Sequence, residues 1–305
     1  MTDVSNAGGQ VLDQAAALLN STQGLLDGVL SNLRKKTVEN DRVSPAKLDA
    51  YQLVSYELSL CWAEYTSGRF VVDYARKLLQ QTPESADFAV RLAALFCAEA
   101  VTAITGRLRA RPADFELSEA DISTVTTGGG AADFLATHLA AESIAALGEQ
   151  VLDRDGDLGI DLLDEDHTMM RDTFRRIADD VVAPLAEEIH REDRDIPDAI
   201  LEPLKEMGLF GLSIPENYGG LQEAGKEDTL GMCVVTEELS RGSLGAAGSL
   251  ITRPEILARA LLKGGTEQQK QHWLPQLAMG EPLCAVAVTE PNYGSDVAGV
   301  KLKAT

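Results

Sequence analysis

The sequence predicts a mainly α-helical protein with one short strand near the end of the chain. Two observations carry this prediction. Apolar residues recur at three- and four-residue steps through most of the 305 residues, and one segment only, residues 283–290, reads as a strand. A chain of this length is enough for about two domains with separate hydrophobic cores.

Charge and composition exclude several classes of protein. The chain carries 27 basic and 48 acidic residues, a net charge of −21, and 45% of its residues are hydrophobic. That hydrophobic content argues against disorder throughout, and the lack of a strongly basic stretch argues against nucleic-acid binding. No stretch approaches ~18 uninterrupted apolar residues, and the first residues lack a signal-peptide pattern. We therefore expect a cytoplasmic protein that neither binds nucleic acid nor inserts into a membrane.

The cysteines predict neither a disulfide nor a zinc site. They are widely separated, lie within apolar segments, and show neither C-x-x-C spacing nor paired histidines. We interpret Cys61, Cys97, Cys233 and Cys284 as reduced core residues, and we expect no metal ligands in the chain.

Residues 1–152 form a helical extension without a cluster of catalytic residue types. We expect helices near 10–32, 45–80, 84–110 and 131–151. Ser44 is the expected N-cap of the second helix, because Pro45 suits the first helical position. The expected core-facing stripe of that helix consists of Leu53, Tyr56, Leu60, Tyr65 and Phe70. The third helix has a stripe of Phe88, Leu92, Leu95, Ala98 and Val101.

Three consecutive glycines precede the last of these helices, at 128–130. A phosphate cradle at a helix N-terminus is one interpretation. No strand precedes the glycines and no Lys-Ser/Thr pair follows them, so we favour a connector between helices.

An acidic linker is expected at 153–163. A calcium loop over 153–164 is the alternative, because Asp153, Asp155 and Asp157 fall at loop positions one, three and five. Two positions contradict the calcium pattern. Leu158 stands where the loop needs a glycine, and Asp164 stands at position twelve, where a glutamate reaches a bidentate geometry more readily.

A second helical domain is expected over 164–282. Its first helix, at 165–191, has one apolar face, and the glycine-rich segment 208–220 is too irregular for a strand or a helix. A capping box from Thr266 to Gln269 opens a helix that should end before Pro275. The remaining helices are expected from Pro197 to before Gly208, at 227–241, and from Pro254 to about Leu262.

The segment 287–299, AVTEPNYGSDVAG, is the most informative in the chain. A strand should end at Thr289, and a turn should follow through Pro291 and Gly294. Such a turn can direct backbone N–H groups and the hydroxyls of Thr289 and Ser295 into one concavity, which suits the carbonyl edge of a ring cofactor or a pyrophosphate. An ordinary turn that ends a strand is the other interpretation, and the segment alone does not decide between them.

Four motifs in one order resemble the acyl-CoA dehydrogenase family of FAD-dependent enzymes. They are GLFGLSIPENYGG, VTEELSRG, GTEQQKQHWLPQLAMGEP and AVTEPNYGSDVAG, spread over residues 164–305. The resemblance implies the family's N-terminal helical domain over 164–282 and the incomplete start of its middle β-domain over 283–305. It also implies that FAD is the cofactor and that the reaction is α,β-dehydrogenation of a CoA thioester.

The resemblance also implies which residues of this chain bind the flavin. Val286, Val288, Thr289, Gly294 and Ser295 would line the cofactor, and Ser295 would also contact the CoA part of the substrate. Tyr293 departs from the family pattern, which has a small residue there, so its ring would either reshape the acyl pocket or turn to solvent. The loop 208–220 is expected to be structural.

Arg253 is a candidate for substrate recognition. It lies in a mostly apolar stretch that, by the resemblance, helps form the floor of the acyl pocket. A guanidinium there could bind a second carboxylate on the substrate. The alternative is a surface arginine that pairs with Glu255, and the extended backbone expected before Pro254 fits either interpretation.

The helical extension resembles that of one subgroup of the family, and this resemblance implies a short, branched, dicarboxylic substrate, with which Arg253 agrees. We expect (2S)-methylsuccinyl-CoA, oxidised to mesaconyl-CoA, with another short or branched acyl-CoA as the alternative. A calcium-binding helical protein and a catalytically silent relative of the same fold are the other function classes.

The catalytic machinery implied by the resemblance is incomplete in this sequence. The family's glutamate base would lie beyond residue 305, so we assign no catalytic residue here, and Glu290 is expected to fix its loop instead. The implied partners are electron-transfer flavoprotein or a similar acceptor and further copies of the chain in a homodimer or homotetramer.

Overall fold

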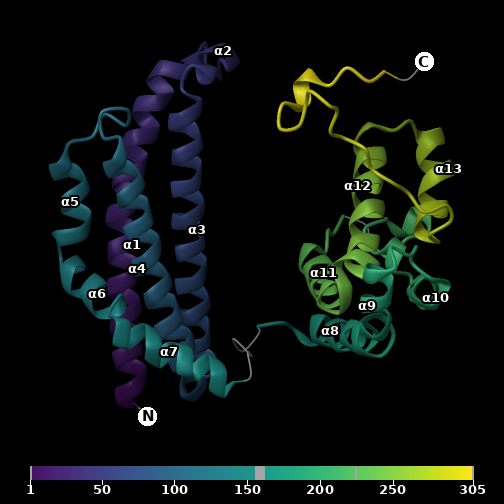
Figure 1. Cartoon of the computed structure of the whole chain (residues 1–305), viewed down its shortest axis with the longest axis horizontal. Coiled ribbons are helices and arrows are strands. Elements are labelled where there is room, and N and C mark those ends of the chain that lie inside the picture. Colours follow the sequence, from purple (N-terminus) through teal and green to yellow (C-terminus); the bar gives the residue numbers. More distant parts are fainter. Residues whose placement is uncertain (1, 155–161, 224, 304–305) are drawn as a thin grey trace. The chain divides into compact units, whose positions relative to one another are not determined.

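The computed structural model describes residues 2–154, 162–223 and 225–303 (Figure 1). They fall into two compact units, Met1–Leu162 and Leu163–Thr305, each of which is described by itself. The mainly α fold is confirmed, because in the described residues the two strands are only two residues long and the other elements are helical. Residues 155–161, which make up most of the predicted calcium loop and of the predicted linker, lie outside the described residues.

Three long helices form the body of the first unit: α1 (Thr2–Thr37), α3 (Gln52–Gln81) and α4 (Asp87–Ala110), which lie side by side (Figure 1). A hairpin of β1 (Val38–Glu39) and β2 (Arg42–Val43) joins α1 to the short α2 (Pro45–Asp49). Its turn residues Asn40 and Asp41 both have positive φ, as a two-residue hairpin turn requires. The unit is completed by α5 (Glu119–Thr127), α6 (Ala131–His138) and α7 (Ala141–Asp153).

The core of the first unit lies between these helices. Its largest fully buried side chains are Leu12, Leu19, Leu26, Leu78, Ile104, Leu108 and Ile122. Gly68 allows the close approach of α3 to α1, because a Cβ there would lie 3.1 Å from the Leu19 side chain. By length and composition α4 is the one helix of the described residues that could cross a membrane, but 61% of its most apolar window is buried inside the protein. Its apolar character therefore serves this core.

The predicted core stripe of α3 is wrong at most positions. Tyr65 is buried as expected, but Leu53, Tyr56 and Phe70 are 52%, 61% and 71% exposed. The buried face consists instead of Leu58, Cys61, Tyr65, Gly68, Val72, Ala75 and Leu78. The helix has two apolar faces, and the predicted set mixes both. On α4 the prediction holds better, since Phe88, Ala98 and Val101 are buried while Leu92 and Leu95 are half-buried.

The three glycines form a connector, as favoured. Helix α5 ends at Thr127 and α6 begins at Ala131, and Gly129 and Gly130 have φ values of 57° and 85°. The cysteine prediction holds in part. All four are free, and Cys61 and Cys97 are buried, but Cys233 is exposed and Cys284 is half-buried.

The second unit is helical apart from its last residues. A continuous helix is formed by α8 (Glu165–Ile177), a π-helical turn (Ala178–Val182) and α9 (Ala183–Arg191), followed by α10 (Asp198–Glu206). Helix α11 (Thr229–Ser243) ends where the backbone of Ser243 is extended, and the Ser243 side chain caps a π-helical turn (Leu244–Gly248) that leads into α12 (Ser249–Gly264). The expected capping box is present: Thr266 caps α13 (Glu267–Ala278), and its backbone N–H donates to Gln269.

Two prolines lie inside helices where helix ends were predicted. Helix α12 begins at Ser249, so Arg253 is helical and not extended, and α13 continues past Pro275 to Ala278. A proline lacks the N–H for the helical hydrogen bond, so these positions are locally unfavourable. Burial outweighs that cost, because Pro254 and its neighbours Leu250 and Ile251 are buried, as are Leu274 and Leu277.

The loop 208–220 is irregular, as predicted, and is held by backbone hydrogen bonds. It contains two 3-10 turns, Leu209–Gly211 and Glu216–Tyr218. The N–H groups of Leu221 and Gln222 donate to the carbonyls of Gly211 and Ile214 at 2.9 and 3.0 Å. Gly220 cannot be replaced without movement, because a Cβ there would lie 1.9 Å from the Ile214 carbonyl oxygen.

The predicted strand at 283–290 does not form in this structure. Among the described residues nothing pairs with 283–289, and Glu290 makes only an isolated bridge to Tyr293. A strand requires a neighbour that accepts and donates its backbone hydrogen bonds. The residues that alternate in sequence therefore remain irregular and mostly exposed.

Candidate functional site

The candidate site is the segment 286–303, which closes on itself through Glu290. The backbone N–H groups of Glu290 and Tyr293 donate to each other's carbonyls at 2.9 and 3.1 Å, which forms the predicted turn. The Glu290 carboxylate then accepts hydrogen bonds from the backbone N–H groups of Lys301, at 3.1 Å, and Leu302, at 2.7 Å. Glu290 therefore fixes the loop, and both of its oxygens are used for that purpose.

Tyr293 belongs to the inside of this loop. A Cβ on Gly299 would lie 2.3 Å from the Tyr293 ring, so the ring packs directly on that glycine. The Lys301 ammonium lies 5.3 Å from the centre of the same ring, within the range of a cation–π contact. The bulky residue at this position thus stabilises the loop itself.

The residues predicted to line the flavin are all exposed in this structure. Val286 and Val288 are 41% and 51% exposed, and Thr289, Gly294 and Ser295 are also exposed. Neither the Thr289 nor the Ser295 hydroxyl forms a hydrogen bond with any other described residue. Exposed hydroxyls and backbone donors beside two valines fit the needs of a flavin, whose ring is apolar on its faces and carries carbonyl acceptors on one edge.

Arg253 is exposed on α12 and lies near the start of the same segment. Burial raises the pKa of the Cys284 thiol, and the positive charge of Arg253 acts on that thiol in the opposite direction. Cys284 packs against the apolar cluster that α12 and α13 share, of which Ala258 and Leu274 are buried members. The expected alternative for Arg253 is not seen, because Glu255 pairs with Arg259 at 3.0 Å.

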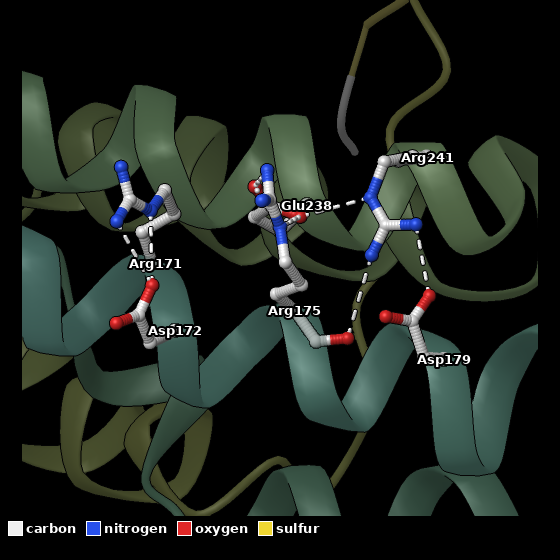
Figure 2. A network of polar contacts seen from close by, with 6 residues as sticks. All are labelled: Arg171, Asp172, Arg175, Asp179, Glu238 and Arg241. Carbon is white, nitrogen blue, oxygen red and sulfur yellow. Dashed lines mark hydrogen bonds and ion pairs between the residues drawn. The ribbon is translucent and has the colours of Figure 1, made fainter. Parts of the chain in front are cut away.

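A buried carboxylate connects α8 to α11, and the sequence did not reveal it (Figure 2). Glu238 has a side chain that is only 3% exposed. Arg175 donates to both of its oxygens from Nε at 3.1 Å and again from Nη2 at 2.7 Å. Arg241 donates from Nε at 3.0 Å and pairs with Asp179 at 2.8 Å. Burial opposes ionisation of Glu238, but the hydrogen bonds from Arg175 and Arg241 outweigh it and hold its pKa below the usual range.

This network is structural. A carboxylate that is buried, ionised and occupied by two guanidinium groups has no free oxygen pair with which to take a proton from a substrate. The sequence signal was the i, i+3 pair Glu238 and Arg241 in VTEELSRG, but Arg175 lies 63 positions from Glu238.

A second contact that spacing could not predict joins the first turns of α8 and α11. His167 lies between two N-cap residues, with Nδ1 2.7 Å from Asp164 and Nε2 2.9 Å from Asp228. Asp164 and Asp228 also accept hydrogen bonds from backbone N–H groups of their own helices. A protonated imidazole can donate to both carboxylates at once, and the hydrogen bonds to Asp228 and Asp164 raise the pKa of His167. We call these three residues the His167 clasp.

Comparison with known proteins finds relatives of the second unit. Residues 164–281 match the family model described as acyl-CoA dehydrogenase, N-terminal domain. The chain is 52% identical over 144 residues to (2S)-methylsuccinyl-CoA dehydrogenase from Cereibacter sphaeroides, which covers 47% of this chain and 25% of that protein. It is 37% identical over 144 residues to mitochondrial isovaleryl-CoA dehydrogenase from Arabidopsis thaliana, covering 47% of this chain and 34% of that protein.

A third relative is named for a different activity. It is 3-(aryl)acrylate reductase from Clostridium sporogenes, 34% identical over 137 residues, which is 45% of this chain and 35% of that protein. The matched region thus spans between a quarter and about a third of the length of these relatives. Residues 164–281 of this chain are therefore similar to the N-terminal domain of the acyl-CoA dehydrogenase family.

Proposed function

We propose that this chain is part of an FAD-dependent dehydrogenase that oxidises (2S)-methylsuccinyl-CoA to mesaconyl-CoA. The observation that carries the substrate is the 52% identity to (2S)-methylsuccinyl-CoA dehydrogenase, against 37% for isovaleryl-CoA dehydrogenase over an equal length. The exposed guanidinium of Arg253 supports the same substrate, because methylsuccinyl-CoA carries a second carboxylate.

The residues of this chain would position the reactants. The Thr289 hydroxyl and neighbouring backbone N–H groups would hold the carbonyl edge of the flavin, and Val286 and Val288 would contact its ring. Ser295 and Gly294 lie on the far side of the Glu290–Tyr293 turn, where they would meet the cofactor chain and the CoA part of the substrate. Bound FAD would supply the acceptor for the hydride that leaves the β-carbon.

No catalytic base is assigned among the described residues. Glu238 is buried in its two arginine contacts, and Glu290 accepts from two backbone N–H groups. We leave the base to a glutamate outside the described residues. An electron-transfer flavoprotein or similar acceptor would reoxidise the flavin, and the reaction would take place in the cytoplasm.

Flavin reduction in the purified protein tests the substrate. The oxidised-flavin absorbance should bleach with (2S)-methylsuccinyl-CoA much faster than with isovaleryl-CoA or butyryl-CoA. If isovaleryl-CoA or another monocarboxylic thioester reduces the flavin faster, then the alternative of a different short or branched acyl-CoA is correct. A protein that binds no FAD would overturn the proposal as a whole.

Substitution of Arg253 tests the carboxylate contact separately. Arg253→Met should lower kcat/KM for methylsuccinyl-CoA by about tenfold to a hundredfold and change kcat/KM for butyryl-CoA little, because a charge-assisted bidentate pair contributes about 1.5–3 kcal/mol. Arg259→Met is the matched control on the same helix, since Arg259 pairs with Glu255 and Glu227. Equal losses for both substrates would remove Arg253 from substrate recognition while leaving the proposed reaction intact.

A further inference from the structure

Helix α3 presents an apolar stripe to solvent on the side away from its core. We call Leu53, Tyr56, Leu60, Ala63, Ser67 and Phe70 the outer stripe. Leu53, Tyr56 and Phe70 are 52%, 61% and 71% exposed, Ala63 and Ser67 are exposed, and Leu60 is half-buried. The stripe lies about 140° around the helix from the buried face, so no residue can serve both. The core of the first unit therefore does not account for it.

The spacing of the outer stripe is that of a coiled-coil seam. Its residues alternate steps of three and four over three heptads, a length of about 26 Å. A seam of this kind is completed by a second helix, whose side chains fill the spaces between the side chains of the first helix. Exposed rings such as Tyr56 and Phe70 are expected where a partner covers the surface, because a row of large apolar side chains is costly to leave in water.

The order of large and small residues makes the outer stripe complementary to itself. If two copies of α3 pair antiparallel about a two-fold axis between Leu60 and Ala63, each large residue meets a small one near the axis. Tyr56 then faces Ser67 of the second copy, and Leu60 faces Ala63 of the second copy. At the two ends Leu53 faces Phe70 of the second copy. Alternation of large and small side chains across facing positions fills such a seam evenly.

The charges beside the outer stripe permit the approach of a second copy. A chain with a net charge of −21 repels its own copies at most places on its surface. On one flank Glu57 and Glu64 are neutralised by their own protomer, because Arg107 contacts both, at 3.2 and 3.3 Å, and Arg111 contacts Glu57 at 3.0 Å. The other flank presents uncharged polar residues, namely Gln52, Ser55, Ser59 and Thr66.

We propose that the outer stripe of α3 is a self-association face, on which α3 of a second copy of this chain packs antiparallel. This inference is independent of the substrate and the cofactor.

Sedimentation of the whole protein with charged substitutions tests the face. Phe70→Glu places a charge at both ends of the paired seam and should weaken association of the first units by about 100-fold or more, because two buried rings are lost for each dimer. Leu152→Glu is the matched control, since Leu152 is 79% exposed on α7 and lies off the stripe. Equal association of both variants and the parent would overturn the proposal, as would a parent whose α3 contacts no second copy.

Cross-linking tests the direction of the pair, and it remains informative if other parts of the protein also associate. In a background with Cys233→Ser and Cys284→Ser, Leu60→Cys and Ala63→Cys are made in separate samples. A short thiol cross-linker should join the mixed samples far more efficiently than either sample alone, because residue 60 faces residue 63 of the second copy. Efficient joining of each single variant would show a parallel pair and refute this register. If no cross-linked dimer forms in the mixed samples or in either sample alone, self-association through the outer stripe is refuted.

Discussion

The His167 clasp predicts a pH-dependent contribution to the stability of the second unit. The perturbation is His167→Gln. Its amide has a single donor nitrogen, which cannot reach Asp164 and Asp228 together. Hydrogen bonds to Asp228 and Asp164 raise the pKa of His167 above its ordinary value near 6.5, and the side chain is only 17% exposed. Among the described residues, Asp228 and Asp164 are the charged groups that raise the pKa of His167.

The size of the effect follows from the exposure of the partners. Asp228 is about half exposed, at 48%, so the His167–Asp228 pair resembles a partly screened ion pair and contributes about 1 kcal/mol. For a unit of this length that corresponds to about 2–5 °C in the melting temperature. A group with a raised folded pKa stabilises fully below its unfolded pKa and loses the contribution as pH rises through the folded pKa. The gap between parent and variant is therefore full below about pH 6.5, the ordinary pKa of histidine, and closes as pH rises through the raised pKa of His167.

Thermal unfolding of parent and variant at a series of pH values measures this gap. His190→Gln is the control, because His190 is an exposed histidine on α9 for which no ion pair is seen among the described residues. A gap that is constant with pH, or that widens as pH rises, would refute a charged imidazole between the two N-caps. NMR titration of the His167 ring provides a second readout, with a midpoint above the ordinary histidine pKa near 6.5.

Three further predictions concern the same unit. Glu238→Gln should lower the free energy of unfolding by about 2 kcal/mol in denaturant titrations, since two arginines lose a buried carboxylate but remain half-exposed. Because the pKa of Glu238 is lowered in the folded protein, this difference should shrink as pH falls below about 4.5. Glu290→Ala should accelerate amide hydrogen exchange at Lys301 and Leu302 by about tenfold or more, and unchanged exchange would contradict the loop closure. Gly220→Ala should destabilise by about 3 kcal/mol through its clash with Ile214, whereas Gly24→Ala, in open space on α1, should stabilise by about 0.5–1 kcal/mol.

Local signals allowed the sequence to predict helix starts and turns. The Thr266–Gln269 capping box and the Glu290–Tyr293 turn both formed, because each depends on residues within four positions of one another. The sequence also indicated the glycine connector at 128–130, whose conformation is set by the glycines themselves. The predicted flavin-lining residues and the role of Arg253 stay predictions, since neither a flavin nor a substrate contact is present to test them.

Packing decided the features that the sequence misjudged. Pro254 and Pro275 are strong local signals for a helix boundary, but both helices bury enough apolar surface to continue through them. On α3 two apolar faces coexist, and periodicity alone does not say which one meets α1 and α4. The polar contacts of His167 and Glu238 were out of reach for a different reason: their partners lie 61 and 63 positions away, so no spacing rule connects them.

These two long-range contacts have a common mechanical consequence. Both join α8 to α11, one at the first turn of each helix and one near the middle, and the apolar cluster with Phe174 and Leu239 packs between the same helices. Helix α11 ends at Ser243, whose extended backbone and hydroxyl cap begin the π-helical turn that leads into α12. The His167 clasp and the Glu238 network therefore fix α11 against α8 at two separate points before the chain turns into α12.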